Sequence, residues 1–129
     1  MKLFLFVVVF PLLLDAFVPP GPSAIEKARS FQSALNQAIS HRDERAVSGH
    51  ISNFFTYVNC YGHHRGDKRD FTRHLLAEQK HGVVTGARDD GTFVHYELNY
   101  GTKKMQYQIG SDETPSLPRL LILAREKSC

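Results

Sequence analysis

The chain has 129 residues, which is enough for one hydrophobic core and too few for two domains of ordinary size. Lysine and arginine exceed aspartate and glutamate by only 16 to 13, and no lysine-rich run marks a surface for nucleic acid or anionic lipid. Hydrophobic residues make up 42 % of the chain, a share that excludes an intrinsically disordered protein.

The first residues are typical of a secretory signal peptide. Lys2 precedes an apolar run over residues 3–14, which is shorter than the roughly 20 residues that a membrane-spanning helix needs. Small residues at Ala16 and Ala24 offer two cleavage positions. We therefore expect a signal peptide over residues 1–16, with cleavage as late as residue 24 as the alternative. The sequence predicts no membrane anchor and a secreted, extracellular product.

Two helices are predicted after this segment. Ser23 and Glu26 have the spacing of a capping box, and apolar residues recur at helical intervals over residues 25–39. Asp43 is a suitable N-cap for a shorter helix over residues 44–50. Both helices are expected to bury one apolar side against a core.

The composition then changes to aromatic and β-branched residues. This change predicts a first strand over residues 52–61. Asp67 predicts the start of a third helix that ends near His81 and Gly82. Gly82 is expected to adopt the left-handed conformation that ends many helices.

Strands and turns are predicted for the remainder of the chain. The strands are expected over residues 83–88, 92–100, 103–109 and 119–125, with a tight turn at residues 89–91. Alternation in the second of these strands divides its side chains between two faces. The core-facing set is Val94, Tyr96, Leu98 and Tyr100. The opposite set is Phe93, His95, Glu97 and Asn99.

The predicted mature chain contains two cysteines, Cys60 and Cys129. In an oxidising compartment a pair of this kind is predicted to form a disulfide. Closing so long a loop would stabilise the fold by about 4 kcal/mol in the chain-entropy model. The alternative is an intermolecular bridge through Cys129.

The order of these elements resembles that of the nuclear transport factor 2-like (NTF2-like) family, a group of cone-shaped α+β domains. The resemblance covers nearly all of the mature chain, residues 23–129. The chain is similar to the small secreted NTF2-like domains of nematodes in two features: the helix start at residues 67–71 and the long alternating strand from Thr92. The resemblance implies three N-terminal helices packed on a curved antiparallel sheet, with a pocket between them.

The core-facing aromatic residues of the strands are predicted to line that pocket. The candidate ligand-binding residues are Phe55, Tyr57, Tyr96, Tyr100 and Tyr107. No carboxylate is expected on the same face, whereas catalysis in the related isomerases and dehydratases needs an ionisable base inside a dry cavity. The predicted function is therefore non-catalytic binding of a hydrophobic small molecule or a protein partner.

Three alternatives follow from the same layout. The first is an isomerase- or dehydratase-like enzyme that uses the same cavity, with His50, Asp70 and His95 as candidates for its ionisable group. The second is a homodimer formed through the outer face of the sheet. The third is a cystatin-like protease inhibitor, since residues 81–86 faintly resemble the inhibitory loop of the cystatins.

The remaining motifs predict neither a metal site nor a cofactor. The seven histidines do not share one helix face: His63 and His64 are expected in a loop, and His74 is expected to face solvent. Residues 65–67 spell the integrin-binding tripeptide, but Asp67 is expected to cap the third helix instead. No catalytic motif is present in the sequence.

Overall fold

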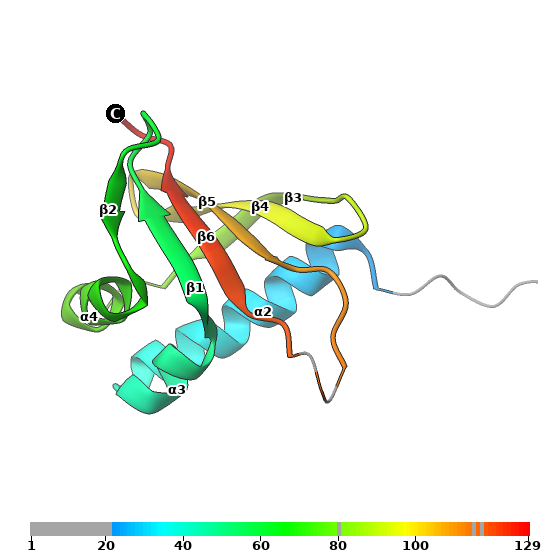
Figure 1. Cartoon of the computed structure of the whole chain (residues 1–129), viewed down its shortest axis with the longest axis horizontal. Helices are drawn as coiled ribbons and strands as arrows, with labels where there is room; N and C mark the ends of the chain where they lie inside the picture. Colours follow the sequence, from blue (N-terminus) through cyan, green and yellow to red (C-terminus); the bar gives the residue numbers. More distant parts are fainter. Residues whose placement is uncertain (1–21, 80, 115, 117) are drawn as a thin grey trace, which may run out of the picture.

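A computed structural model describes residues 22–79, 81–114, 116 and 118–129, and the signal peptide predicted over residues 1–16 lies outside them. These residues form three helices and a six-stranded sheet (Figure 1). The elements are α2 (Ala24–Ser40), α3 (Glu44–Gly49), β1 (Ile51–Val58), β2 (His64–Gly66), α4 (Lys68–Glu78), β3 (Val83–Asp89), β4 (Phe93–Tyr100), β5 (Lys103–Gly110) and β6 (Leu121–Glu126). No helix in the described part of the chain is long and apolar enough to cross a membrane.

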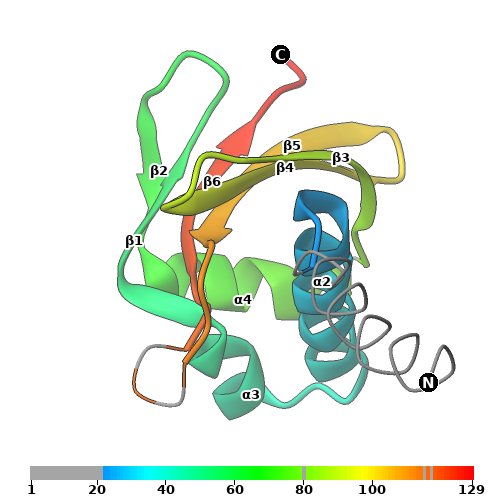
Figure 2. The same ribbon diagram turned by 90° about the vertical axis from the view of Figure 1, so that its right-hand side faces the viewer.

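The sheet has the strand order β2-β1-β6-β5-β4-β3 and curves around the helices (Figure 2). This arrangement confirms the predicted α+β class with three helices packed on a curved sheet. The sheet is mixed, however, because β1 pairs in parallel with β6, Tyr57 lying opposite Ala124. β6 lies between β1 and β5, and its run of apolar residues suits a strand with neighbours on both sides.

Each helix begins at the N-cap that the sequence indicates. The hydroxyl of Ser23 accepts a hydrogen bond from the backbone N of Glu26, and Asp43 accepts one from Ala46. Asp67 and Asp70 form a complete capping box at the start of α4. Capping thus fixes three helix starts locally, because each cap satisfies backbone donors that the helix leaves unpaired.

The end of α4 differs from the prediction. The left-handed residue is Gln79, with φ of 50°, and Gly82 has a different role. The backbone N of Gly82 donates to Oδ1 of Asn36 at 3.0 Å, and its carbonyl accepts from Nδ2 of Asn36 at 2.9 Å. A Cβ at position 82 would collide with Leu98 and would lie 3.0 Å from Nε2 of Gln32. Glycine is needed here because the chain passes so close to α2 and β4.

Several strand boundaries also differ from the predictions. β1 ends at Val58, three residues early, because Oδ1 of Asn59 accepts from the backbone N of Tyr61 and of His63 and so forms a turn. His64, predicted in a loop, begins the short strand β2. β6 starts two residues late and extends one residue further, to Glu126.

The core lies between α2 and the concave face of the sheet. The buried side of α2 consists of Ala28, Phe31, Gln32, Leu35, Ala38 and Ile39. On β4 the predicted alternation is confirmed: the four residues expected in the core are buried, and the other four are partly or fully exposed. At the N-terminal end of α2, Lys27 forms an ion pair of 2.8 Å with Asp89 at the end of β3, which fixes the helix against the edge of the sheet.

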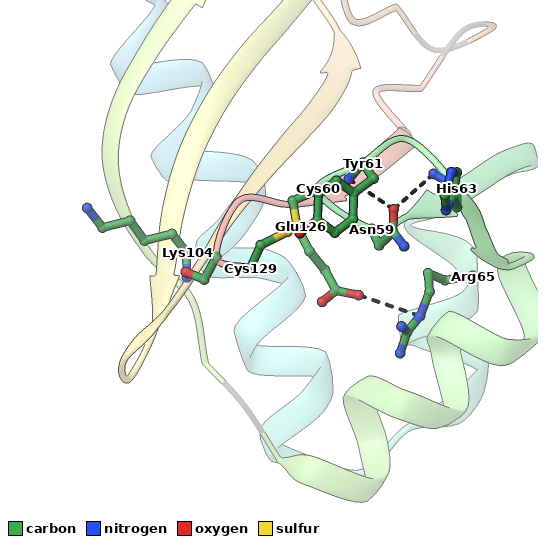
Figure 3. The surroundings of a disulfide bond; sticks show 9 residues. Asn59, Cys60, Tyr61, His63, Arg65, Lys104, Glu126 and Cys129 are labelled. Carbon is green, nitrogen blue, oxygen red and sulfur yellow. Dashed lines mark hydrogen bonds and ion pairs between the residues drawn. A yellow bond between two sulfur atoms is a disulfide. The ribbon is translucent and has the colours of Figure 1, made fainter.

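A disulfide joins Cys60 to Cys129, with a Cα–Cα distance of 6.1 Å (Figure 3). Cys60 lies in the turn between β1 and β2, and Cys129 follows β6. The bond therefore connects an edge hairpin to the strand in the middle of the sheet. It joins the two cysteines that were predicted to form a disulfide within one chain.

Replacing Gly82 by alanine is expected to destabilise the protein by about 1–3 kcal/mol, because the added methyl group overpacks the contact between α2 and β4. Gly86→Ala is the matched control, since a Cβ there meets nothing within 4 Å and φ is not positive. Urea unfolding of both variants measures the difference. Equal stabilities for the two variants would contradict the close approach described at Gly82.

Candidate functional site

A small enclosed cavity lies between α4 and the concave face of the sheet. Its volume is about 20 Å³. Its lining residues are Tyr57, Phe71, His74, Leu75, Tyr100, Lys103, Met105 and Glu126. Such a volume admits about one water molecule, whereas pockets for drug-sized ligands typically enclose roughly 300–1,000 Å³. In this conformation the cavity is therefore a closed site with room for one small group.

The register of the sheet brings the lining residues together. Glu126 on β6 lies opposite Met105 on β5, and Ala124, two residues earlier, lies opposite Tyr107. Because side chains alternate along a strand, Glu126 shares the inner face with these residues. Tyr57 is opposite Ala124 on the other side of β6. The carboxylate of Glu126 thus reaches the same cavity as the hydroxyl of Tyr57.

Helix α4 supplies the opposite wall. Phe71, His74 and Leu75 follow one another at helical spacing, so they lie on the same side of the helix. The ring centroid of Tyr57 is 5.0 Å from that of Phe71 and 5.9 Å from that of His74. Phe71 and His74 are stacked, with centroids 6.1 Å apart. Three rings from two elements therefore form a continuous aromatic surface beside the cavity.

The carboxylate of Glu126 is the acidic group of the cavity wall. Its Oε1 atom is buried and has no hydrogen-bond partner among the described residues. This atom lies 3.7 Å from Nε of Arg65, whose side chain is 55 % exposed (Figure 3). Burial, followed by hydrogen bonding to Glu126 and the charge of Glu126, raises the pKa of Tyr57 to about 12. Tyr57 is therefore a neutral hydroxyl at physiological pH.

Deeper in the core, tyrosine hydroxyls are paired with neighbours in the protein. Tyr96 donates to Oε1 of Gln32 at 2.7 Å, and the hydroxyls of Tyr100 and Tyr107 contact each other. Burial raises the pKa of each of these three tyrosines. The paired hydroxyls fill the region behind the cavity, and the free space lies nearer the end of the sheet.

The five predicted ligand-binding residues divide into two groups. Tyr57 and Tyr100 line the cavity. Phe55, Tyr96 and Tyr107 are 4 %, 1 % and 0 % exposed and belong to the hydrophobic core. They support the wall from behind: Phe55 packs on Phe71 with centroids 4.9 Å apart.

The residues considered for an ionisable catalytic group lie elsewhere. His50 follows α3, with Nδ1 2.7 Å from the carbonyl of Ala46. Asp70 takes part in the capping box of α4. His95 lies on the outer face of the sheet, and its Nε2 is hydrogen-bonded to Oδ2 of Asp90 at 2.8 Å. None of these three side chains lines the cavity between α4 and the sheet.

Two expectations about the cavity are wrong. His74, expected to face solvent, lines the cavity, because it lies three residues after the buried Phe71 on the same side of α4. A carboxylate was not expected on the inner face, yet Glu126 is there because β6 extends one residue beyond its predicted end. Continuing the alternation from Ala124 would have identified Glu126. Lys103 was missed although it lies two residues before Met105 in the predicted strand over residues 103–109, so the alternation places it on the inner face.

The other motifs are used within the fold. Arg65 pairs with Glu126, and Asp67 caps α4, so two members of the integrin-like tripeptide already have partners. Residues 81–86, compared with the cystatin loop, run past the buried Gly82 into β3 at the edge of the sheet. No group of three or more potential metal ligands occurs within residues 22–79, 81–114, 116 and 118–129.

Solved structures share this architecture. An NTF2-like protein from Cytophaga hutchinsonii is similar, with a TM-score of 0.59 at 10 % identity, over 84 % of this chain and 100 % of that chain. An NTF2-like protein of unknown function from the same bacterium gives 0.52 at 13 % identity, over 84 % and 92 %. A protein of unknown function with a cystatin-like fold from Nostoc punctiforme gives 0.54 at 13 % identity, over 81 % and 91 %.

Comparison by sequence finds no counterpart. No protein-family model matches the chain, and no curated protein matches it. At such low identities the structural likeness concerns the fold alone. The fold is NTF2-like, which confirms the fold predicted from the order of the elements.

The raised pKa of Tyr57 predicts how stability depends on pH. Between pH 10, the ordinary tyrosine pKa, and about pH 12, the unfolded chain loses the hydroxyl proton of Tyr57, whereas the folded protein keeps it. The stabilisation is therefore complete below pH 10 and is lost as the pH rises towards 12. Urea unfolding measures the free energy of unfolding at pH 8 and at pH 11. The decrease between the two pH values should be smaller in Tyr57→Phe than in the wild type. Tyr61→Phe, which alters a tyrosine that is 76 % exposed, serves as the control and should behave as the wild type does. If the free energy of unfolding of Tyr57→Phe decreased as much as that of the wild type, the raised pKa of Tyr57 would be contradicted.

Proposed function

We propose that this chain is a secreted NTF2-like domain that binds a small apolar molecule in the cavity between α4 and the sheet, without catalysing a reaction on it. The observation that supports this proposal most is the set of residues that line the cavity. Aromatic rings and the apolar side chains of Leu75 and Met105 line it together with a few polar groups. That combination is typical of ligand sites, in which apolar surface provides affinity and polar groups provide orientation.

Secretion is supported by two independent features. Residues 1–16 have the composition of a signal peptide cleaved after Ala16, with Ala24 as the alternative. The disulfide between Cys60 and Cys129 is compatible with an oxidising compartment. The exported domain would then comprise residues 23–129, and the small secreted NTF2-like domains of nematodes are the type we propose for it.

Binding of any molecule larger than water requires the cavity to widen. α4 is the element best suited to move, because its buried residues are only Phe71, Thr72 and Leu75. It ends at the left-handed residue Gln79. A small outward shift of its C-terminal half would enlarge the cavity without disturbing the sheet. A protein partner at the same place, and a homodimer through the outer sheet face around Phe93 and His95, stay predictions.

The proposal predicts that affinity rises with ligand length. Burying one additional CH₂ group contributes about 0.8 kcal/mol, which is roughly fourfold in affinity. From 1-butanol through 1-pentanol to 1-hexanol, we expect about this increase at each step. The measurement is a titration followed by the shifts of backbone amide NMR signals in α4 and β6.

A blocking variant locates the site in the same titrations. His74→Trp places a larger ring at the rim of the cavity, where the His74 side chain is 34 % exposed, and should weaken binding of all three alcohols. His64→Trp introduces the same ring on the exposed strand β2 and should leave binding unchanged. Affinities that do not depend on chain length, or that His74→Trp leaves intact, would count against the proposal.

A second candidate function is an isomerase- or dehydratase-like enzyme in the same cavity. The specific observation in its favour is that Glu126 and His74 both line the cavity, so an ionisable base is present where such chemistry needs one. Tyr57, protonated at neutral pH, is a hydrogen-bond donor beside Glu126. This combination provides a base and a donor on one inner surface.

If Glu126 acts as a general base, the protein should exchange protons next to a carbonyl group. Incubation with cyclohexanone in D₂O, followed by proton NMR, measures this exchange. The rate should fall in Glu126→Gln and stay unchanged in Glu97→Gln, which alters an exposed glutamate on the outer face of the sheet. Equal rates for the wild type and Glu126→Gln would exclude Glu126 as the base in this reaction.

A further inference from the structure

We infer that the molecule bound in this cavity is uncharged and carries one hydrogen-bond donor, as an alcohol or a phenol does, at the end that enters next to Glu126. This inference rests on the proposed function and names the chemical class of its ligand. It follows from three properties of the cavity wall: an unpaired acceptor, a balanced charge and an apolar surface.

The need for a donor comes from Glu126. Its Oε1 atom is buried and lacks a hydrogen-bond partner within the described part of the chain. Tyr57 hydrogen-bonds to the carboxylate, but Oε1 itself is left without a hydrogen bond from the described residues. Buried polar atoms in folded proteins nearly always have such a partner, so Oε1 favours a ligand that brings an N–H or O–H group to it. The cavity of about 20 Å³ admits one group of the size of a water molecule, which is also the size of a hydroxyl.

The absence of charge on the ligand follows from the groups around Glu126. Nε of Arg65 lies 3.7 Å from Oε1 and balances the charge of the carboxylate. Lys103, also in the lining, would repel a cationic ligand. An anionic ligand would instead meet the carboxylate itself. A neutral donor hydrogen-bonds to Oε1 and leaves the existing ion pair intact.

Once the cavity widens, the remainder of its wall offers apolar surface to the body of the ligand. Phe71 and Tyr57 present ring surfaces, and Leu75 and Met105 add aliphatic groups. A ligand that is polar along its whole length would lose hydrogen bonds to water without replacement here. The inferred ligand therefore has one donor at one end and hydrocarbon behind it.

Two isomers test this inference directly. 1-Hexanol and methyl pentyl ether have the same formula and nearly the same size, but only the alcohol has a donor. Titrations followed by the NMR shifts of backbone amides in α4 and β6 should show the alcohol binding about tenfold more tightly, the effect expected of a hydrogen bond to a carboxylate. Hexylammonium and hexanoate should both bind more weakly than 1-hexanol.

Variants identify the acceptor. Glu126→Met keeps the length of the side chain and removes both oxygens, so the two isomers should bind this variant with equal affinity. Glu97→Met makes the same replacement on the outer face, at an exposed position, and should preserve the tenfold difference. If Glu126→Met does not fold, the comparison of isomers on the wild-type protein still decides the question.

Each contrary outcome has a separate meaning. Equal affinity of the wild type for the alcohol and the ether would overturn the inferred donor while leaving the proposed binding function in place. Tightest binding of hexylammonium would overturn the inferred neutrality. If none of the four compounds binds at saturable concentrations, both this inference and the proposed function fail.

Discussion

Tyrosines on the concave face of the sheet place hydroxyl groups where water is excluded, and the arrangement of the helices depends on pairing them. Tyr96 donates to Gln32, the amide of Gln32 donates to Asn36, and Asn36 holds Gly82 through two hydrogen bonds. This chain of bonds runs from β4 across α2 to the segment before β3. An unpaired buried hydroxyl costs about 1–3 kcal/mol, so α2 cannot slide along the sheet without losing stability.

The same pairing determines where a binding site is left. Tyr100 and Tyr107 contact each other, and with Tyr96 they fill the interior between α2 and the sheet. An enclosed space lies at the end of the sheet beside α4, and there Oε1 of Glu126 has no hydrogen-bond partner among the described residues. The tyrosine hydroxyls of the core are thus paired, whereas Oε1 of Glu126 is available to accept a hydrogen bond.

The parts of the structure that depend on neighbours in sequence could be predicted, and those that depend on long-range pairing could not. Ser23 and Asp67 mark helix starts because a cap acts within three residues. The left-handed Gln79 follows no residue preference, since glycine is the usual choice. The strand alternation places Glu126 on the inner face, and helical spacing places His74 beside Phe71. That both side chains meet at one cavity depends on the orientation of α4 on the sheet and on the parallel register of β1 with β6, which are not encoded locally.

The position of β6 also has a consequence for biosynthesis. The strand that follows all others along the chain lies in the interior of the sheet, between β1 and β5. While this segment is still being synthesised, β1 lacks its neighbour β6 and Cys60 lacks its partner Cys129. The sheet therefore cannot be completed strand by strand in the order of synthesis. Both the interior position of β6 and the disulfide are filled only after the last strand has been made, so closure of the sheet and of the covalent loop depends on the same final segment.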